Sequence, residues 1–220
     1  MRLFAALLPP QRARDELARA LEPHRAAWPR LRWADPGNWH LTLAFLGEVA
    51  EEVLPELEVR LARAASRHAP MTLAFTGAGA FPSARRARVL WAGLRDCADP
   101  PGETGPHSEP GRWGGRPRDG ADPRRGRPRI VRLAESVRAG ARRAGAVQVD
   151  ESKRFRPHLT LARSRFDADV SPLVGALGPF AGTPWEAGAV HLVRSRLGAE
   201  IRYETVAEWP LAARAPGGRG

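Results

Sequence analysis

His40-Leu41-Thr42-Leu43-Ala44 occurs a second time, letter for letter, as His158-Leu159-Thr160-Leu161-Ala162. Successive side chains of a β-strand point to opposite faces, so each copy sets its His and Thr on one face and its leucines on the other. The leucines suit a core. The similar stretch 71–75, Met-Thr-Leu-Ala-Phe, shows that such a strand does not need a His. A purely structural repeat would leave both imidazoles unexplained. The repeat therefore predicts two equivalent strands that bring two His and two Thr to one site.

Strand and helix patterns alternate around both copies. We expect strands at 1–8, 31–34, 39–46, 71–75, 87–94, 158–162, 189–194 and 203–207, and a Gly-rich turn at 77–83. Helices are expected after Pro10, with Leu17, Ala20, Leu21 and Ala27 on the apolar face, and at 48–67, 129–145 and 172–177. Many connections are short, which favours mixed or antiparallel sheets over a doubly wound fold. The prediction is an α+β fold of two lobes with outer helices and a central cleft that carries both His-x-Thr-x motifs.

Length and composition fit one globular domain over residues 1–220, built from two pseudo-symmetric lobes, since 43% of the residues are apolar. Pro and Gly make up 14 of the 33 residues at 96–128, which indicates a disordered insertion, and 214–220 is expected to be a flexible tail.

The formal charge of +11 suggests a polyanionic partner such as RNA. Only Lys153 among the 35 basic residues is a lysine, so coding bias offers another explanation of the charge. The single cysteine, Cys97, excludes an intramolecular disulfide and fits a reducing cytoplasm. No apolar run approaches the ~18 residues of a membrane span. We expect a cytoplasmic monomer with no membrane association.

Neither motif has the neighbouring ligands of a zinc site, a recognisable Ser or Cys nucleophile, or a phosphate-binding glycine loop. We therefore expect no metal and no cofactor. Two imidazoles can supply one general base and one general acid near neutral pH. Phosphodiester hydrolysis needs that pair, and hydroxyl groups such as those of Thr42 and Thr160 can stabilise the charged phosphoryl oxygens.

The two His-x-Thr-x motifs resemble those of the 2H phosphoesterase superfamily. The stretches 2–10, 38–47, 79–82 and 156–163 resemble its RNA 2',3'-cyclic phosphodiesterase branch, also called 2'-5' RNA ligase. The resemblance implies a bilobal α+β fold and metal-independent opening of a 2',3'-cyclic phosphate at an RNA end to a 2'-phosphate. It also implies that His40 is the proton donor and His158 the proton acceptor, with Thr42 and Thr160 holding phosphoryl oxygens.

Four further residues are candidates for substrate binding. Arg163 matches a phosphate-binding position of the family, although strict alternation sets it on the leucine face and puts Arg156 on the His158 face. Phe4 and Trp39 are candidates for stacking on a base, with core packing as the alternative.

Two other functions stay open at this point. The positive charge is also compatible with an RNA-binding protein that has no turnover. Other 2H branches imply a small cyclic nucleotide or ADP-ribose cyclic phosphate as substrate instead of RNA ends or nucleotides with a 2',3'-cyclic phosphate. Ligation of RNA ends is possible by reversal of the hydrolysis.

Overall fold

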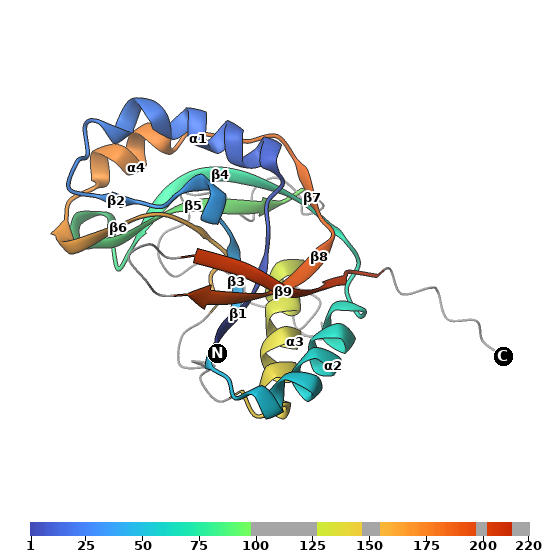
Figure 1. Cartoon of the computed structure of the whole chain (residues 1–220). Coiled ribbons are helices and arrows are strands. Elements are labelled where there is room, and N and C mark those ends of the chain that lie inside the picture. The colour runs from blue at the N-terminus through green and yellow to red at the C-terminus, as the bar shows by residue number, and fades with distance from the viewer. Residues whose placement is uncertain (98–126, 147–154, 197–201, 213–220) are drawn as a thin grey trace, which may run out of the picture.

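A computed structural model describes residues 1–97, 127–146, 155–196 and 202–212 of the chain. Its first sheet is built around β1 (Arg2–Leu7), which pairs with β3 (Leu41–Glu48) on one side and β8 (Ala189–Arg196) on the other. β9 (Arg202–Pro210) extends the sheet beyond β8. This sheet therefore joins the first strand of the chain to the last two strands that the structure describes (Figure 1).

The second sheet has the strand order β2, β6, β5, β4, β7. Its bounds are β2 (Arg32–Trp33), β4 (Met71–Phe81), β5 (Ala87–Asp96), β6 (Leu159–Ala168) and β7 (Trp185–Ala187). Every pairing between these strands is antiparallel, as it is in the first sheet. The α+β prediction is confirmed, and the two copies of the repeat lie in different sheets, one in β3 and one in β6.

The α-helices of the described residues lie outside the sheets (Figure 1). α1 (Gln11–Arg25) and α4 (Ser171–Leu177) lie over the second sheet, while α2 (Leu54–Ala65) and α3 (Arg129–Arg143) pack on each other and cover the first sheet. Short 3-10 turns occur at Pro36–Asn38, Glu51–Val53 and Ala84–Arg86. Pro55 lies in the first turn of α2, where its missing N–H costs nothing, and the helix accordingly begins later than residue 48.

The alternation along β1 separates two apolar regions. Leu3, Ala5 and Leu7 belong to the main core, whereas Phe4 and Ala6 face the other way and pack with Val193. In β3 the repeat behaves as predicted, because Leu41 and Leu43 are fully buried in the main core. The sheet surface opposite that core carries the His and Thr of the motif, and we call it the motif face of each sheet.

Two predictions about individual segments were wrong, and one strand was missed. The expected turn at 77–83 is largely strand, because β4 continues to Phe81. Gly77 adopts a positive φ of 52°, which glycine tolerates, and it forms a bulge within β4. The strand therefore continues through this glycine, where a turn was expected. Ala27 is exposed and lies beyond the end of α1. The short strand β7 was not predicted.

Most of the predicted insertion at 96–128 and the tail at 214–220 lie outside the described residues. In the described part of the chain, no helix is both long and apolar enough to cross a membrane.

Candidate active site

The two motif histidines occupy equivalent positions, each directly before its strand. The Nδ1 atom of His40 lies 2.8 Å from the carbonyl oxygen of Asn38, and Nδ1 of His158 lies 2.7 Å from the carbonyl oxygen of Arg156. A carbonyl oxygen can only accept, so Nδ1 of each ring is the donor and carries the proton. Nε2 of each neutral ring is then the atom that can take up a proton, which fixes the tautomer that acid and base catalysis needs.

A β-bulge occurs at the same place in both motif strands. In β3, Thr42 pairs with Ala6 while Ala44 pairs with Ala5, so Leu43 has no partner of its own. In β6, Thr160 pairs with Trp91 while Ala162 pairs with Leu90, so Leu161 is the extra residue. An extra residue reverses the alternation of side chains beyond it. The residue three places after each Thr therefore returns to the motif face.

This bulge brings Arg163 to the motif face of the second sheet and Phe45 to that of the first. Strict alternation puts Arg163 on the leucine face, and the bulge in β6 reverses that alternation. Arg163 is exposed, and its charge lowers the pKa of both His40 and His158. Phe45, its counterpart, is 63% exposed.

Burial is the main influence on the two imidazoles. Loss of solvation lowers the pKa of His40 and of His158, the hydrogen bonds to the Asn38 and Arg156 carbonyls oppose this, and Arg163 lowers both further. The charge of His158 also lowers the pKa of His40. The two rings therefore lie within electrostatic range of each other, and protonation of one disfavours protonation of the other. Such a pair suits one acid and one base.

Aromatic rings hold each imidazole in place. The His40 ring centroid lies 4.6 Å from that of Phe4 and 5.0 Å from that of Tyr203, the latter edge to face. The His158 centroid lies 5.0 Å from Phe81, again edge to face, and 6.3 Å from Trp91. Sequence reasoning did not select Tyr203, Phe81 or Trp91 as site residues. Two signals were available: Phe81 falls in the stretch 79–82 that resembles the family, and Tyr203 is the single tyrosine of the chain.

A pocket of roughly 200 Å³ opens beside His40. Its lining combines rings with hydrogen-bonding groups and includes Phe4, Tyr203, Asn38, Thr205 and Arg14. Nη1 of Arg14 donates to the carbonyl oxygen of Gly37 at 3.2 Å and so joins α1 to the turn before His40. A mixed aromatic and polar lining of this kind suits a nucleoside.

The remaining sequence candidates have different surroundings. Trp39 is 3% exposed and belongs to the main core, although it also borders the pocket, and Phe4 is 4% exposed. Neither ring offers much surface to a base. The guanidinium of Arg156 lies 5.9 Å from the centre of the Phe81 ring. Among the described residues, no three His, Cys, Asp or Glu side chains are grouped as a metal site would require.

Comparison with known proteins places this site in a family context. A family model described as LigT like phosphoesterase matches residues 7–91 and 122–203, which include both motifs. Residues 92–121 fall between the two matched parts.

The curated relatives named below are all called RNA 2',3'-cyclic phosphodiesterase. The RNA 2',3'-cyclic phosphodiesterase of Thermus thermophilus is 32% identical over 94% of this chain and 88% of its own length, and that of Escherichia coli is 30% identical over 79% and 76%. The one from Geobacillus stearothermophilus is 25% identical over 98% of this chain, which spans 59% of that relative.

Solved structures of similar proteins have the same fold as this chain. TT0787 of Thermus thermophilus superposes with a TM-score of 0.72 at 28% identity, covering 98% of this chain and all of the other. E. coli LigT in complex with 3'-AMP superposes with a TM-score of 0.69 at 27% identity, covering 96% of this chain and 98% of the other.

Proposed function

The chain belongs to the LigT like phosphoesterase family, and from this premise we propose that it is an RNA 2',3'-cyclic phosphodiesterase that opens a terminal 2',3'-cyclic phosphate to a 2'-phosphate. The observation that carries the proposal is the matched pair His40 and His158. Each ring is fixed through Nδ1 by the carbonyl two residues before it, and the two rings lie within electrostatic range of each other. His40 directly before β3 and His158 directly before β6 thus supply one acid and one base.

The hydrolysis needs one proton removed and one supplied. We assign His158 as the base: its Nε2 takes a proton from water as the water oxygen attacks phosphorus. The P–O3' bond breaks, and Nε2 of protonated His40 gives its proton to the departing 3'-oxygen. The products are a 2'-phosphate and a 3'-hydroxyl, and exchange with solvent restores both rings. The assignment of donor and acceptor follows the family pattern.

Charge on the phosphoryl oxygens rises as water attacks. Thr42 and Thr160 lie on the motif faces beside the two histidines, and their hydroxyls are suitable donors to those oxygens. Arg163 adds a positive charge that acts on both rings, and a guanidinium can donate two parallel hydrogen bonds to a phosphate. Together they replace the charge stabilisation that a metal ion gives in other phosphoesterases.

The same groups can perform a ligation. If the 5'-hydroxyl of a second RNA end takes the place of water, the P–O3' bond breaks in the same way and a 2'-5' phosphodiester forms. Because the reaction is reversible in principle, this ligation is a second activity of the same site and needs no additional residue.

The test is turnover of uridine 2',3'-cyclic phosphate and of a short RNA with a 2',3'-cyclic end, in the presence of EDTA. Phosphorus NMR should identify a 2'-phosphate as the product. His40→Ala and His158→Ala should each lower kcat by about 10²- to 10⁴-fold, the usual contribution of a general acid or base.

His68→Ala is the matched control, because the His68 ring bonds to Ser136 in the helical layer behind the first sheet and should not affect kcat. Full activity of either motif variant would contradict the proposed roles. Salt-dependent RNA binding without turnover of any cyclic phosphate would instead indicate a binding protein.

A further inference from the structure

The edge of the second sheet carries two arginines directly opposite each other. β2 is the edge strand, and in its antiparallel pairing with β6 Arg32 stands opposite Arg163. Opposite residues of such a pair point to the same face with their Cβ atoms about 4.5–5.5 Å apart. Arg32 therefore shares the motif face with Arg163, and both side chains are exposed.

The neighbouring residue confirms the orientation of β2. Trp33 pairs with the buried Ala162 and packs against the main core, with the guanidinium of Arg25 5.6 Å from the centre of its ring. Because side chains alternate along a strand, Arg32 points the other way. The bond from the Ala34 N–H to the Leu161 carbonyl, 2.8 Å long, continues this pairing and fixes the register.

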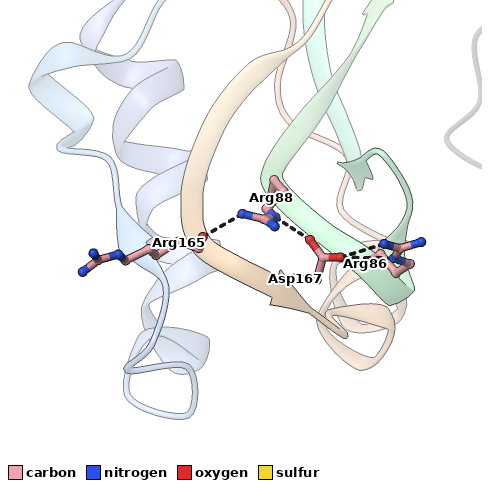
Figure 2. A network of polar contacts seen from close by, with 4 residues as sticks. All are labelled: Arg86, Arg88, Arg165 and Asp167. Atoms are coloured by element: carbon pink, nitrogen blue, oxygen red, sulfur yellow. Dashed lines mark hydrogen bonds and ion pairs between the residues drawn. The ribbon is translucent and has the colours of Figure 1, made fainter.

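Like charges directly opposite each other destabilise a sheet unless an anion lies between them. In the described part of the chain, neither Arg32 nor Arg163 has a carboxylate within ion-pair distance. Two nearby arginines do: Arg86 of the 3-10 turn Ala84–Arg86 and Arg88 of β5 both bond to Asp167, and Arg88 also donates to the Arg165 carbonyl (Figure 2). Among the described residues, Arg95 of β5 and Arg165 of β6 also lack an acidic partner, so what distinguishes Arg32 and Arg163 within the second sheet is that they stand opposite each other.

The two arginines lie at different distances from the histidines. Arg163 affects the pKa of both histidines, so it lies near the reacting phosphate, whereas Arg32 is one strand further out at the edge of the sheet. A polyanionic chain that ends at the histidines and leaves over this edge would meet Arg163 first and Arg32 next.

We propose that Arg32 binds the backbone phosphate that precedes the cyclic phosphate, so that the enzyme prefers the end of an RNA strand to a cyclic mononucleotide. This inference rests on the proposed function and narrows its substrate class. A guanidinium suits this task because its donors match the geometry of phosphate oxygens. A cyclic mononucleotide has no such phosphate.

The experiment compares kcat/KM for a trinucleotide with a 2',3'-cyclic end and for uridine 2',3'-cyclic phosphate, using the full chain. The ratio of the two should exceed one in the natural protein and fall roughly ten-fold in Arg32→Gln, as expected for one lost charge-assisted hydrogen bond. The salt dependence of kcat/KM for the trinucleotide should become less steep by about 0.7 in the log–log slope, the value per phosphate in single strands.

Arg63→Gln is the control for the loss of one positive charge, because Arg63 is exposed on α2 behind the first sheet, and it should leave the ratio unchanged. A ratio that stays the same in Arg32→Gln overturns the inference while leaving the proposed function intact. Binding of a 5'-fluorescein trinucleotide ending in a 2'-phosphate gives a readout that needs no turnover. Equal affinity of the natural protein and Arg32→Gln would also overturn the inference.

Discussion

Arg163 influences both motif histidines, His40 and His158, at once. It lies on the motif face of the second sheet, and its positive charge disfavours the protonated form of His40 and of His158. Burial acts in the same direction and more strongly. The imidazole proposed as the acid therefore gives up its proton more readily than an ordinary His, and the one proposed as the base stays neutral to a lower pH than an ordinary His.

The first prediction concerns the pH profile of kcat/KM, which reports the ionisations of the free enzyme. The profile should be bell-shaped, with both limbs below the ordinary His pKa of roughly 6.5, because both pKa values are lowered. Arg163→Gln should shift both limbs to higher pH, since it removes a positive charge that lowers both values. The measurement is kcat/KM for uridine 2',3'-cyclic phosphate across the acidic and neutral range.

Arg163→Lys is the matched variant, because it keeps the charge but not the planar guanidinium. It should lower activity with little movement of the limbs. If Arg163→Gln left both limbs where they are in the natural protein, the electrostatic role of Arg163 would be excluded.

At the scale of elements, the paired bulges of β3 and β6 determine which side chains share the motif faces. Each bulge uses the second leucine of the motif as its extra residue and so returns the next but one residue, Phe45 or Arg163, to the side of the Thr. β4 has a bulge of its own at Gly77, within the strand that brings Phe81 against His158. These three bulges therefore lie in the strands that supply the residues of the site.

Gly79 leaves room for the Trp91 ring, which lies beside His158. A Cβ atom there would come within 2.2–2.8 Å of three atoms of the Trp91 ring, which lies across the glycine and beside His158. Gly79→Ala must therefore displace Trp91 and with it the imidazole. We expect kcat to fall roughly ten- to hundred-fold, as for a small misplacement of a catalytic group. The measurement is kcat at saturating cyclic nucleotide, with circular dichroism to show that the sheets persist.

Gly175→Ala is the control for this substitution. Gly175 lies in α4 with nothing within 4 Å of the position of a Cβ atom. This variant should keep full activity and gain about 0.5–1 kcal/mol in free energy of unfolding from the better helix propensity of Ala. A Gly79→Ala protein as active as Gly175→Ala would show that the position of Trp91 does not matter to the reaction.

At the scale of the whole molecule, the order of the strands brings distant parts of the sequence together. The first sheet takes β1 and β3 from the beginning of the chain and β8 and β9 from its end, while the second takes its central strands from the middle. His40 consequently has Tyr203 of β9 as a neighbour, and His158 has Phe81 and Trp91. Each motif is completed by residues far from it in sequence.

The stability of the molecule should depend on buried imidazoles. Four of the six histidines, His40, His68, His158 and His191, have a pKa that burial lowers. Below roughly pH 6.5 the unfolded chain binds protons that the folded chain does not, so stability rises with pH in this range and is lost as the pH falls. The Tm in buffers free of phosphate should therefore be lower at about pH 5 than at about pH 7.

His68→Gln supplies the control, because it removes one titrating ring outside the active site while leaving a group able to bond to Ser136. The variant should lose part of the pH dependence of the Tm. A Tm that stays constant or rises between about pH 7 and pH 5 would contradict the linkage.

The amino-acid sequence predicted most of the elements and selected His40 and His158 as the pair for which catalysis is proposed. Helix periodicity gave the apolar face of α3, where Ile130, Leu133, Val137 and Ala141 are buried as expected. Alternation placed Leu41 and Leu43 in the core. Glycines were harder to interpret, because Gly77 and Gly79 serve a bulge and a ring contact within β4, and a local pattern cannot distinguish these uses from a turn.

The sequence by itself determined that two His and two Thr stand on equivalent strand faces, because a period of two is a local property of the backbone. Only the tertiary structure decided that the two strands belong to different sheets, that Arg163 faces the histidines, and that Tyr203, Phe81 and Trp91 enclose the two rings. Strand order and bulges depend on which partner a strand pairs with, and pairing is set by contacts between residues far apart in the chain. The same pairing sets Arg32 opposite Arg163 and so gives the site its proposed preference for an RNA end.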